Sequence, residues 1–353
     1  MNLSDREWKE FKVEEIFEVF NSKPYHKKNL TSIKSYNEEY IPYITRTNRN
    51  NGLEDIVENK KEFKTNPKNI IVFGAENATF FYQPFEHITG NKMYGIKNNI
   101  RNKYIGLFIQ QVFNTSINGC GFSYGQGLTG KREKRRSIML PVKKDNDKEP
   151  DWTFMERYVD NILNEKNIKY QEYIKPILSC LKYEKIPKLE EKKWNEFFLI
   201  DLFPLIQRGK RIVKSKQIEG LKPYISSTSM NNGVDNYISN DKNVRIFKDC
   251  LTIANSGSVG SSFYQPFEFV ASDHVTHLKN NKMNKYIYLF IATLTNRFSE
   301  KYNFNREIND KRISREKIML PVNDNNEVDY EYMEQYIKNI MIEKYKKYCE
   351  YLT

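Results

Sequence analysis

The sequence predicts a mixed α/β protein made of two tandem copies of one strand-rich unit, each copy followed by a long helix. The hexapeptide FYQPFE occurs at residues 81–86 and again at 263–268, which is 182 positions later. Aligned segments before and after it keep offsets between 178 and 186, so the duplicated unit is roughly 180 residues long. The chain of 353 residues also exceeds the ~250–300 residues at which one core stops growing.

Each copy opens with the same segment, WKEFKVEEIF at 8–17 and WNEFFLIDLF at 194–203. Short runs rich in Ile, Val, Phe and Tyr follow, bounded by turn residues, and they predict strands. The strands are expected at 41–45, 69–74 and 78–85 in the first copy and at 222–227, 249–255 and 261–270 in the second. The tripeptide NNG, at 50–52 and 231–233, predicts a turn in which glycine supplies a positive φ.

A short helix is expected after the strands of each copy. Apolar residues recur at helical spacing over 102–113 and over 284–295. A basic segment comes next, and it leads into a short apolar strand that ends in MLPV at 139–142 and at 319–322.

Two longer helices are predicted over 151–174 and 329–352, because apolar residues stand there at near-heptad spacing. Asp151 and Asp329 occupy the expected N-cap positions, and Pro176 is expected to end or kink the first helix. At ~1.5 Å per residue such a helix is ~36 Å long, about one turn of B-DNA. The apolar stripes favour antiparallel pairing of the two helices as a coiled-coil spacer. Packing of each helix on its own domain is the alternative.

Composition and charge narrow the class of partner. The net charge of +12 and the pI of about 9.2 favour a polyanion, nucleic acid first. A basic scaffold that binds acidic proteins is an alternative. No apolar stretch approaches ~20 residues, and the N-terminus lacks the apolar core of a signal peptide, so a cytoplasmic protein is expected. The four cysteines are widely spaced, which predicts reduced thiols.

The sequence offers little catalytic chemistry, and no cofactor is predicted. It contains no GxGxxG that follows a predicted strand and no phosphate-binding GxxxxGK[ST] motif. HVTH at 274–277 lacks a third ligand nearby, so no metal is expected. PD at 150–151 and EEK at 190–192 formally fit a nuclease pattern, which keeps a self-contained nuclease at a two-part DNA site as an alternative. Asp151 at a helix cap and Glu190 in a charged linker argue against it.

A basic run recurs at the same place in both copies. KREKRR at 131–136 has a counterpart that retains three of its cations. Such residues supply salt-sensitive contacts to phosphates, whereas a solvated surface is the ordinary alternative. The candidate phosphate contacts in this run are Lys131, Arg132, Arg135, Arg136, Lys311, Arg312 and Arg315.

Base recognition requires polar residues that differ between the copies. TRTNRNNG at 45–52 aligns with SSTSMNNG at 226–233, and arginine reads guanine while asparagine reads adenine in the major groove. The basic stretches at 20–28 and 206–216 also diverge, as do YGQGLTG at 124–130 and FNREIND at 304–310. The candidate DNA-binding residues in these strings are Lys23, Lys27, Lys28, Arg46, Asn48, Arg49, Asn50, Arg208, Lys210, Arg211, Ser227, Ser229 and Asn231.

The order of these motifs resembles a known family. Tandem halves that open with WxEF, continue with PYI[ST] and pass through a basic segment into IMLPV and a helix resemble the specificity subunits of type I restriction–modification enzymes and the related type IIB subunits. The resemblance covers nearly the whole chain. It implies a non-catalytic subunit that recognises a bipartite site in double-stranded DNA. It also implies docking of methyltransferase subunits, joined by a restriction subunit in type I systems, with methyl donor, ATP and Mg²⁺ bound by those partners.

The resemblance also assigns the segments. They are a first target-recognition domain at 1–150, a spacer helix with its linker at 151–186, a second target-recognition domain at 187–328 and a second spacer helix at 329–353. The two halves are expected to be related by an internal pseudo-two-fold axis.

Overall fold

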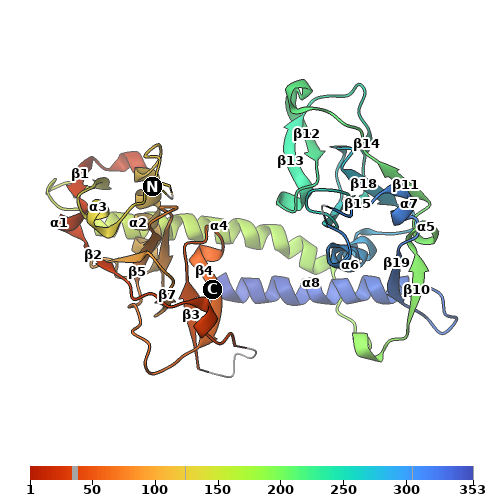
Figure 1. The fold of residues 1–353 in the computed structure, drawn as a ribbon, viewed down its shortest axis with the longest axis horizontal. Coiled ribbons are helices and arrows are strands. Elements are labelled where there is room, and N and C mark those ends of the chain that lie inside the picture. Colours follow the sequence, from red (N-terminus) through yellow and green to blue (C-terminus); the bar gives the residue numbers. More distant parts are fainter. Residues whose placement is uncertain (34–38, 124, 304, 353) are drawn as a thin grey trace. The chain divides into compact units, whose positions relative to one another are not determined.

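The structure is a computed structural model that describes residues 1–33, 39–123, 125–303 and 305–352. It divides into two compact units, Met1–Tyr170 and Gln171–Thr353 (Figure 1). Strands and helices alternate in both units, so the prediction of a mixed α/β fold with strand-rich halves is confirmed. No helix in the described part of the chain combines the length and the apolarity needed to cross a bilayer.

The first unit contains, among its described residues, one four-stranded, one three-stranded and one two-stranded sheet, with strand orders β2-β8-β5-β6, β4-β3-β7 and β1-β9. Its strands are β1 (Trp8–Lys12), β2 (Glu18–Asn21), β3 (Tyr40–Ile44), β4 (Leu53–Glu58), β5 (Ile70–Gly74), β6 (Phe80–Gln83), β7 (Ile88–Thr89), β8 (Met93–Lys97) and β9 (Ser137–Pro141). Its helices are α1 (Val13–Ile16), α2 (Lys103–Ser116), α3 (Gly130–Lys134) and the start of α4 (Trp152–Cys180), with 3₁₀ turns at Leu3–Asp5, Lys27–Asn29 and Asn50–Gly52.

The second unit repeats this topology with one added strand, β14, and its orders are β11-β18-β15-β16, β13-β12-β17-β14 and β10-β19. Its strands are β10 (Trp194–Phe198), β11 (Leu205–Arg208), β12 (Glu219–Ile225), β13 (Val234–Ile238), β14 (Ile246–Phe247), β15 (Cys250–Ala254), β16 (Ser262–Gln265), β17 (Phe269–Ala271), β18 (Val275–Lys279) and β19 (Lys317–Pro321). Its helices are α5 (Leu199–Leu202), α6 (Lys285–Thr295), α7 (Asp310–Ile313) and α8 (Tyr330–Leu352), with 3₁₀ turns at Leu189–Glu191, Lys214–Lys216, Asn231–Gly233 and Asn296–Glu300.

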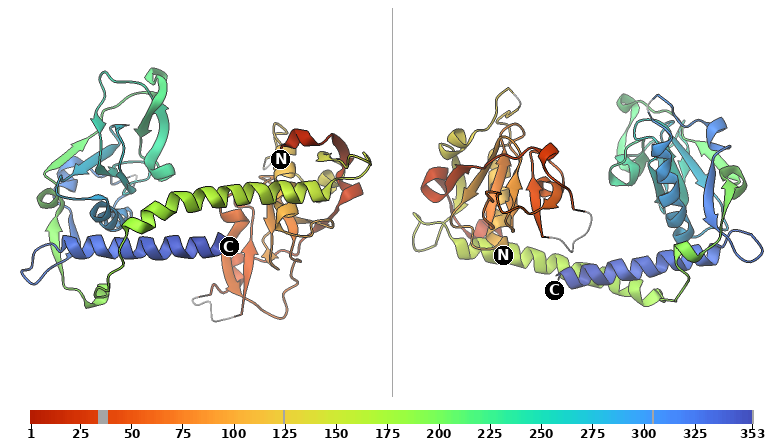
Figure 2. Two further views of the ribbon diagram at one scale, coloured as in Figure 1. Left: turned by 180° about the vertical axis from the view of Figure 1, so that it is seen from behind. Right: turned by 60° about the horizontal axis from the view of Figure 1, so that its bottom comes forward.

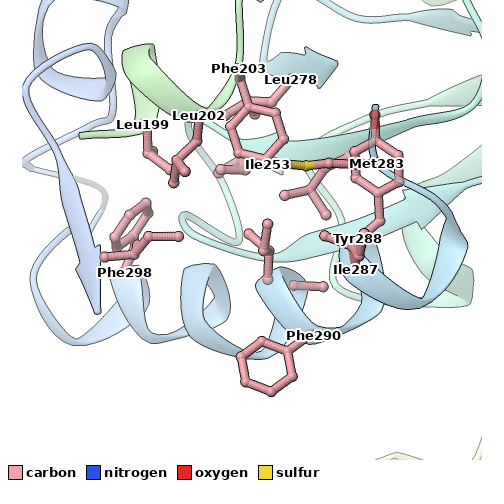
Figure 3. Packing of buried hydrophobic residues seen from close by; sticks show 14 of the residues in the cluster. Leu199, Leu202, Phe203, Ile253, Leu278, Met283, Ile287, Tyr288, Phe290 and Phe298 are labelled. Atoms are coloured by element: carbon pink, nitrogen blue, oxygen red, sulfur yellow. The ribbon is translucent and has the colours of Figure 1, made fainter. Parts of the chain in front are cut away.

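The core of each unit forms where a helix covers the four-stranded sheet. Strand β5 is a continuous apolar run that is buried along its whole length, and α2 packs over it and over β6 (Figure 2). Phe80 and Phe113 are both fully buried, and their rings stack with centroids 5.0 Å apart. Burial of one such ring stabilises the fold by roughly 2–3 kcal/mol. In the second unit, α5 and α6 converge on β15 and β18 in the same way, with Phe203 and Tyr288 at the centre (Figure 3).

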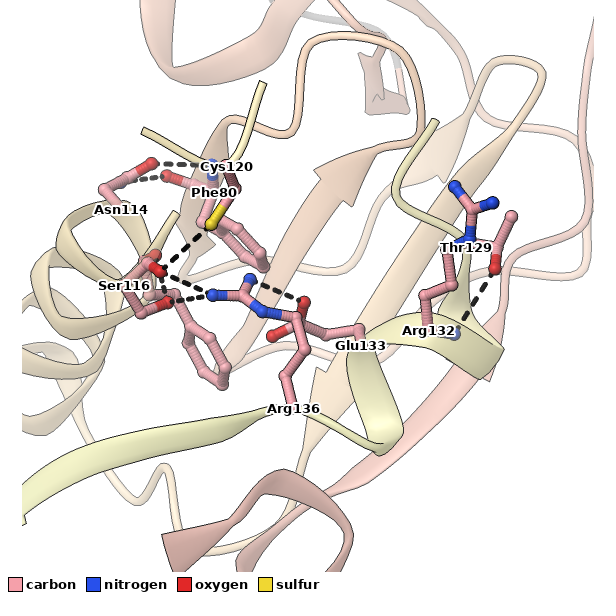
Figure 4. A network of polar contacts seen from close by, with 9 residues as sticks. Phe80, Asn114, Ser116, Cys120, Thr129, Arg132, Glu133 and Arg136 are labelled. Carbon is pink, nitrogen blue, oxygen red and sulfur yellow. Dashed lines mark hydrogen bonds and ion pairs between the residues drawn. The ribbon is translucent and has the colours of Figure 1, made fainter. Parts of the chain in front are cut away.

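One polar contact joins the helix to the sheet in both units. The side-chain amide of Asn114 on α2 accepts a hydrogen bond from the Phe80 amide at 3.0 Å and donates one to its carbonyl at 2.9 Å (Figure 4). Asn296 makes the same pair of bonds to Ser262, at 2.8 and 3.1 Å. This asparagine closes the otherwise open edge of the terminal strand, because its amide presents one acceptor and one donor in the pattern of a neighbouring strand.

We expect Asn114→Ala to lower the free energy of unfolding of the first unit by roughly 1–3 kcal/mol, because it leaves both main-chain groups of Phe80 without this partner. Urea unfolding of the full chain measures the loss. The matched control is Asn118→Ala, which removes an exposed asparagine two residues beyond the end of α2. Equal effects of the two substitutions would contradict the role of Asn114.

The predicted turns and caps are present. Gly52 has a φ of +78° and Gly233 a φ of +81°, as the NNG turns require. The carboxylate of Asp151 accepts from the Phe154 amide at 2.9 Å, and Asp329 accepts from Tyr332 at 3.0 Å, so both are N-caps.

The first long helix differs from the prediction at its end. It continues past Pro176 to Cys180, so the proline does not terminate it. Within the second unit, the segment that follows runs against α8. The Gln335 side chain donates to the Lys182 carbonyl at 2.8 Å, and the Tyr332 hydroxyl donates to the Pro187 carbonyl at 3.0 Å. The segment and α8 therefore run in opposite directions at this point.

Candidate nucleic-acid interface

The divergent string of the first unit, residues 45–52, forms a turn that is pinned at its base and exposed at its tip. The Thr45 amide bonds to the Gly52 carbonyl at 2.8 Å, and the Asn51 side chain donates to the Tyr82 carbonyl at 2.8 Å. Asn48 and Arg49 are exposed. The base of the turn is thus fixed by bonds to the main chain, whereas the tip is available to a ligand.

The corresponding turn of the second unit, residues 226–233, has the same base. The Ser226 amide bonds to the Gly233 carbonyl at 3.0 Å, and the Gln265 side chain donates to the Asn232 carbonyl at 2.8 Å. Ser229 is exposed at its tip. The two units therefore present different side chains on one backbone design.

Three further segments gather around this turn in the first unit. The loop between β5 and β6 lies at the centre, because the Ala75 carbonyl accepts from the Leu128 amide at 2.7 Å and the Ala75 amide donates to the Lys92 carbonyl at 3.0 Å. In the second unit Asn255 makes the same two bonds, with Ile308 at 3.1 Å and with His274 at 2.8 Å. Segments that are distant in the sequence thus meet at one end of each unit.

A cluster of charges joins the turn to the β5–β6 loop in the first unit. The carboxylate of Glu76 pairs with the guanidinium of Arg46 on one oxygen and with the Lys92 ammonium, at 2.8 Å, on the other. The hydrogen bond from Lys92, together with the charge of Arg46, holds the pKa of Glu76 below its usual value. The side chain of Glu76 is 20% exposed, so the cluster lies at the surface.

Asn77 strengthens the same junction. Its side-chain amide donates to the main-chain carbonyl of Arg46 and to the side-chain oxygen of Asn48. Thr79 adds a longer hydroxyl contact to Asn48 at 3.5 Å. Two of the candidates in this turn, Arg46 and Asn48, are therefore held by the β5–β6 loop.

The second unit fills the equivalent position with serines and a histidine. The Ser258 amide donates to the Ser227 carbonyl at 3.0 Å, and the Ser256 hydroxyl lies 2.6 Å from Nδ1 of His274. His274 is the equivalent of Lys92. The Lys92 carbonyl binds the β5–β6 loop of the first unit, and the His274 carbonyl binds the β15–β16 loop of the second. The chemistry of the two tips therefore differs, whereas their scaffold does not.

The basic runs form short helical turns beside these loops. Thr129 caps α3 through a 3.3 Å bond from the Arg132 amide, and the Arg132 guanidinium donates to the Gly127 carbonyl at 2.6 Å. In the second unit Arg312 repeats this contact with the Glu307 carbonyl. The exposed cations of the two turns are Lys131, Arg132, Lys134, Arg135, Lys311, Arg312 and Arg315.

Arg136 belongs to the same run, but its side chain points into the unit (Figure 4). Its guanidinium pairs with Glu133, which is fully buried, at 3.1 Å and donates to the Ser116 carbonyl at 2.6 Å. Burial raises the pKa of Glu133, and the charge of Arg136 opposes that rise. The second unit replaces Arg136 by Glu316, which pairs with Lys301 at 2.8 Å. Arg136 is thus committed to an internal ion pair.

The remaining candidates of the first unit lie between β2 and β3, with Lys27 and Lys28 in a 3₁₀ turn. Lys23 adjoins β7, because its carbonyl accepts from the Thr89 hydroxyl at 3.4 Å. The Lys27 ammonium pairs with Glu54 on β4 at 2.8 Å, and Lys28 is exposed beside it.

In the second unit, Arg208 reaches the central segments through a 3.4 Å contact to the Ile308 carbonyl. Lys210 lies 3.4 Å from the Asn243 side chain, and Arg211 is exposed. Arg245 also belongs here, because it donates to the Arg208 carbonyl at 2.7 Å.

The sequence prediction missed several members of these clusters. They are Glu76, Asn77, Lys92, Arg245, Ser256 and His274. A usable signal was present, since Lys92 and His274 occupy equivalent positions in the duplication and carry different side chains. Of the divergent strings around α3 and α7, Tyr124 and Phe304 lie outside the described residues.

Comparison with known proteins gives a consistent result. The family model for the type I restriction modification DNA specificity domain matches residues 5–171 and again residues 191–350. The type II restriction enzyme BgcI specificity subunit S.BcgI of Heyndrickxia coagulans is 32% identical over 307 residues, which cover 85% of this chain and 86% of that protein. The S subunit of a type I restriction–modification system from M. genitalium has a similar fold, with a TM-score of 0.54 and 14% identity over 100% of this chain and 95% of that one.

Proposed function

The chain belongs to the type I restriction–modification DNA specificity family, and on that premise we propose that its two halves read the two parts of one bipartite DNA site. It carries two tandem specificity domains and is a recognition subunit, while the chemistry is done by other subunits. Residues 1–150 and 187–328 are the proposed target-recognition domains. Residues 151–186 and 329–353 are the proposed spacer segments.

One observation carries this proposal. The bonds that assemble the loops run through the main chain and recur in both units, as in Ala75 with Leu128 and Asn255 with Ile308. The side chains at the tips differ, with Arg46 in one unit and Ser227 in the other. A repeated scaffold with unlike tips is what recognition of two different half-sites requires, since base edges are read by side chains and phosphates by shared cations.

The spacer role is supported by contacts inside the second unit. Residues 182–187 run antiparallel to α8 through the bonds of Gln335 and Tyr332. We propose that this pairing extends along the two long helices and sets the distance between the half-sites.

Docking of methyltransferase subunits, joined by a restriction subunit in a system that cleaves DNA, is supported by an exposed methionine that recurs in both units. Met139 on β9 and Met319 on β19 are 48% and 45% exposed, and they occupy equivalent positions. Met139 lies with Leu107 and Leu163 along a hollow between α2 and α4. Apolar side chains exposed in the middle of a surface are typical of protein–protein contacts. Their recurrence fits one kind of partner bound twice.

We test the proposal with the full chain, assembled with its cognate methyltransferase subunit and mixed with a pool of duplexes that carry a long randomised segment. Selected duplexes should share two short motifs separated by a spacer of fixed length and no fixed sequence. A single uninterrupted motif, or no motif, would contradict the bipartite assignment. Plasmid incubated with the purified chain and Mg²⁺ should stay intact, whereas cleavage would favour the nuclease alternative.

A further inference from the structure

The charge cluster at the tip of the first unit combines a candidate reader with an acid that the DNA proposal does not use. A carboxylate beside a DNA-binding surface opposes phosphate binding, because both are negatively charged. Glu76 nevertheless lies there, in contact with Arg46 and Lys92. The role of Glu76 at this position is therefore something other than raising the affinity for DNA.

We infer that Glu76 is a specificity-determining residue, which positions the Arg46 guanidinium for a base edge and withholds it from the phosphate backbone. The inference rests on the function proposed above. A guanidinium is planar and carries five N–H donors in a fixed fork, and a carboxylate that binds one edge fixes the direction of the other. The Nη1 group of Arg46 donates a hydrogen bond to the Glu76 carboxylate. The remaining donors keep the paired geometry that guanine recognition requires.

A second contact fixes the root of the same side chain. Asn77 binds the main-chain carbonyl of Arg46, so the backbone and the guanidinium of this residue are both held by one loop. Gly74 ends β5 directly beneath, and a Cβ there would lie 2.5 Å from Cγ of Arg46. The stem of Arg46 therefore crosses a position that only glycine leaves open. Arg46 is thus restrained at its carbonyl, its stem and its tip.

The charge of Glu76 predicts opposite effects of its removal on affinity for arbitrary DNA and on base selection. Glu76 neutralises one of two adjacent cations, so it lowers the number of positive groups free to bind phosphates. Removal of the carboxylate releases the Arg46 guanidinium, which can then contact the backbone of any duplex. Affinity for arbitrary DNA then rises while base selection falls. A residue that serves only to stabilise the fold would lower both.

The effect is confined to one half of the site. In the second unit the position is filled by Ser256, Ser258 and His274, and the turn carries Ser227 where the first unit has Arg46. Base selection by the second half is therefore independent of Glu76.

The test compares Glu76→Gln with the unaltered chain, each assembled with the methyltransferase subunit and selected on the same randomised duplex pool. We expect the preference at one or two adjacent positions of one half-site to fall about tenfold, with the other half-site unchanged. On a fixed duplex that lacks the motif, we expect tighter binding and a salt dependence that is steeper by roughly one to two released ions.

The matched control is Glu18→Gln. Glu18 pairs with Lys97 at 3.0 Å, so the substitution also breaks a Glu–Lys ion pair and adds one positive charge. It does so at the opposite end of strand β8, roughly 16 Å from Lys92 at ~3.3 Å per residue. The selected motif should be unchanged in this variant.

Two further results bear on the inference. Glu76→Asp keeps the charge but withdraws the carboxylate by one methylene, so it should fold and weaken the same position only partly. An unaltered chain that selects no motif defeats the proposed function. If the unaltered chain selects a motif, the proposed function stands. The role of Glu76 alone is then contradicted if the Glu76→Gln and Glu76→Asp variants select the same motif, or if they lose preference evenly at all positions.

Discussion

Replacement of Lys131, Arg132 and Arg135 by alanine should weaken binding to every duplex by roughly tenfold to a hundredfold at low salt. All three side chains are exposed on or next to α3, and the Arg132 guanidinium already bonds to the neighbouring Gly127 carbonyl. Phosphate contacts carry no sequence information, so the loss should be equal for cognate and random DNA. The slope of log affinity against log salt should become shallower by up to about 2.7.

Arg136 stays in place in this variant, although the sequence groups it with the other cations. Its pairing with buried Glu133 means that its removal would leave a carboxylate without its partner and would confuse unfolding with loss of binding. The control replaces Lys143, Lys144 and Lys148, three exposed lysines of the loop after β9, which removes the same charge elsewhere. An unchanged salt slope, or a loss equal to that of the control, would remove α3 from the phosphate-binding surface.

The second large effect concerns stability in acid. His87 is fully buried at the start of β7, with Nδ1 3.0 Å from the Phe85 carbonyl, and burial lowers its pKa to about 4. In the unfolded chain the pKa of His87 is near ~6.5. Between pH ~6.5 and about 4, His87 is therefore protonated in the unfolded chain and neutral in the folded one. The contribution of neutral His87 to the free energy of unfolding should be fully present above that window, and it should be lost as the pH falls through it. By pH 5 the loss from His87 is roughly 2 kcal/mol.

Hydrogen–deuterium exchange of strands β5 to β7 at pH 7.5 and pH 5 measures this effect in the first unit alone. His87→Gln should reduce the difference in protection between the two pH values, and His26→Gln, which removes an exposed histidine of the same unit, should not. Burial also lowers the pKa of His277 in the second unit, so acid destabilises that unit in the same direction. An acid response in β5 to β7 that persists in His87→Gln would assign it to other groups.

Much of the fold could be predicted because its signals are local or repeated. The NNG turns and the two aspartate caps are short-range features, and the duplication doubled the number of observations for each element. Of the two effects expected of Pro176, a kink or an end of α4, the end is wrong, because the helix continues to Cys180. At that point the chain packs within the second unit, where Ile174 is only 2% exposed.

The site was harder to predict, because a sequence does not show whether a charged side chain points to solvent or into the protein. Arg135 and Arg136 are neighbours, yet one faces solvent and the other enters the unit to meet Glu133 and Ser116. Glu76 is a single acid in a short turn, and its partner Arg46 is 30 residues away along the chain. Contacts of this length depend on the pairing of β3 and β5 with other strands, which a single sequence does not specify.

The main-chain bonds that join the loops also bear on how such a protein changes over generations. Because the Ala75 and Asn255 junctions are held by peptide groups, substitutions at the tips leave those bonds intact. A lineage can therefore acquire a new target in one half by a few surface mutations, at little cost in stability and with the other half still reading its old sequence.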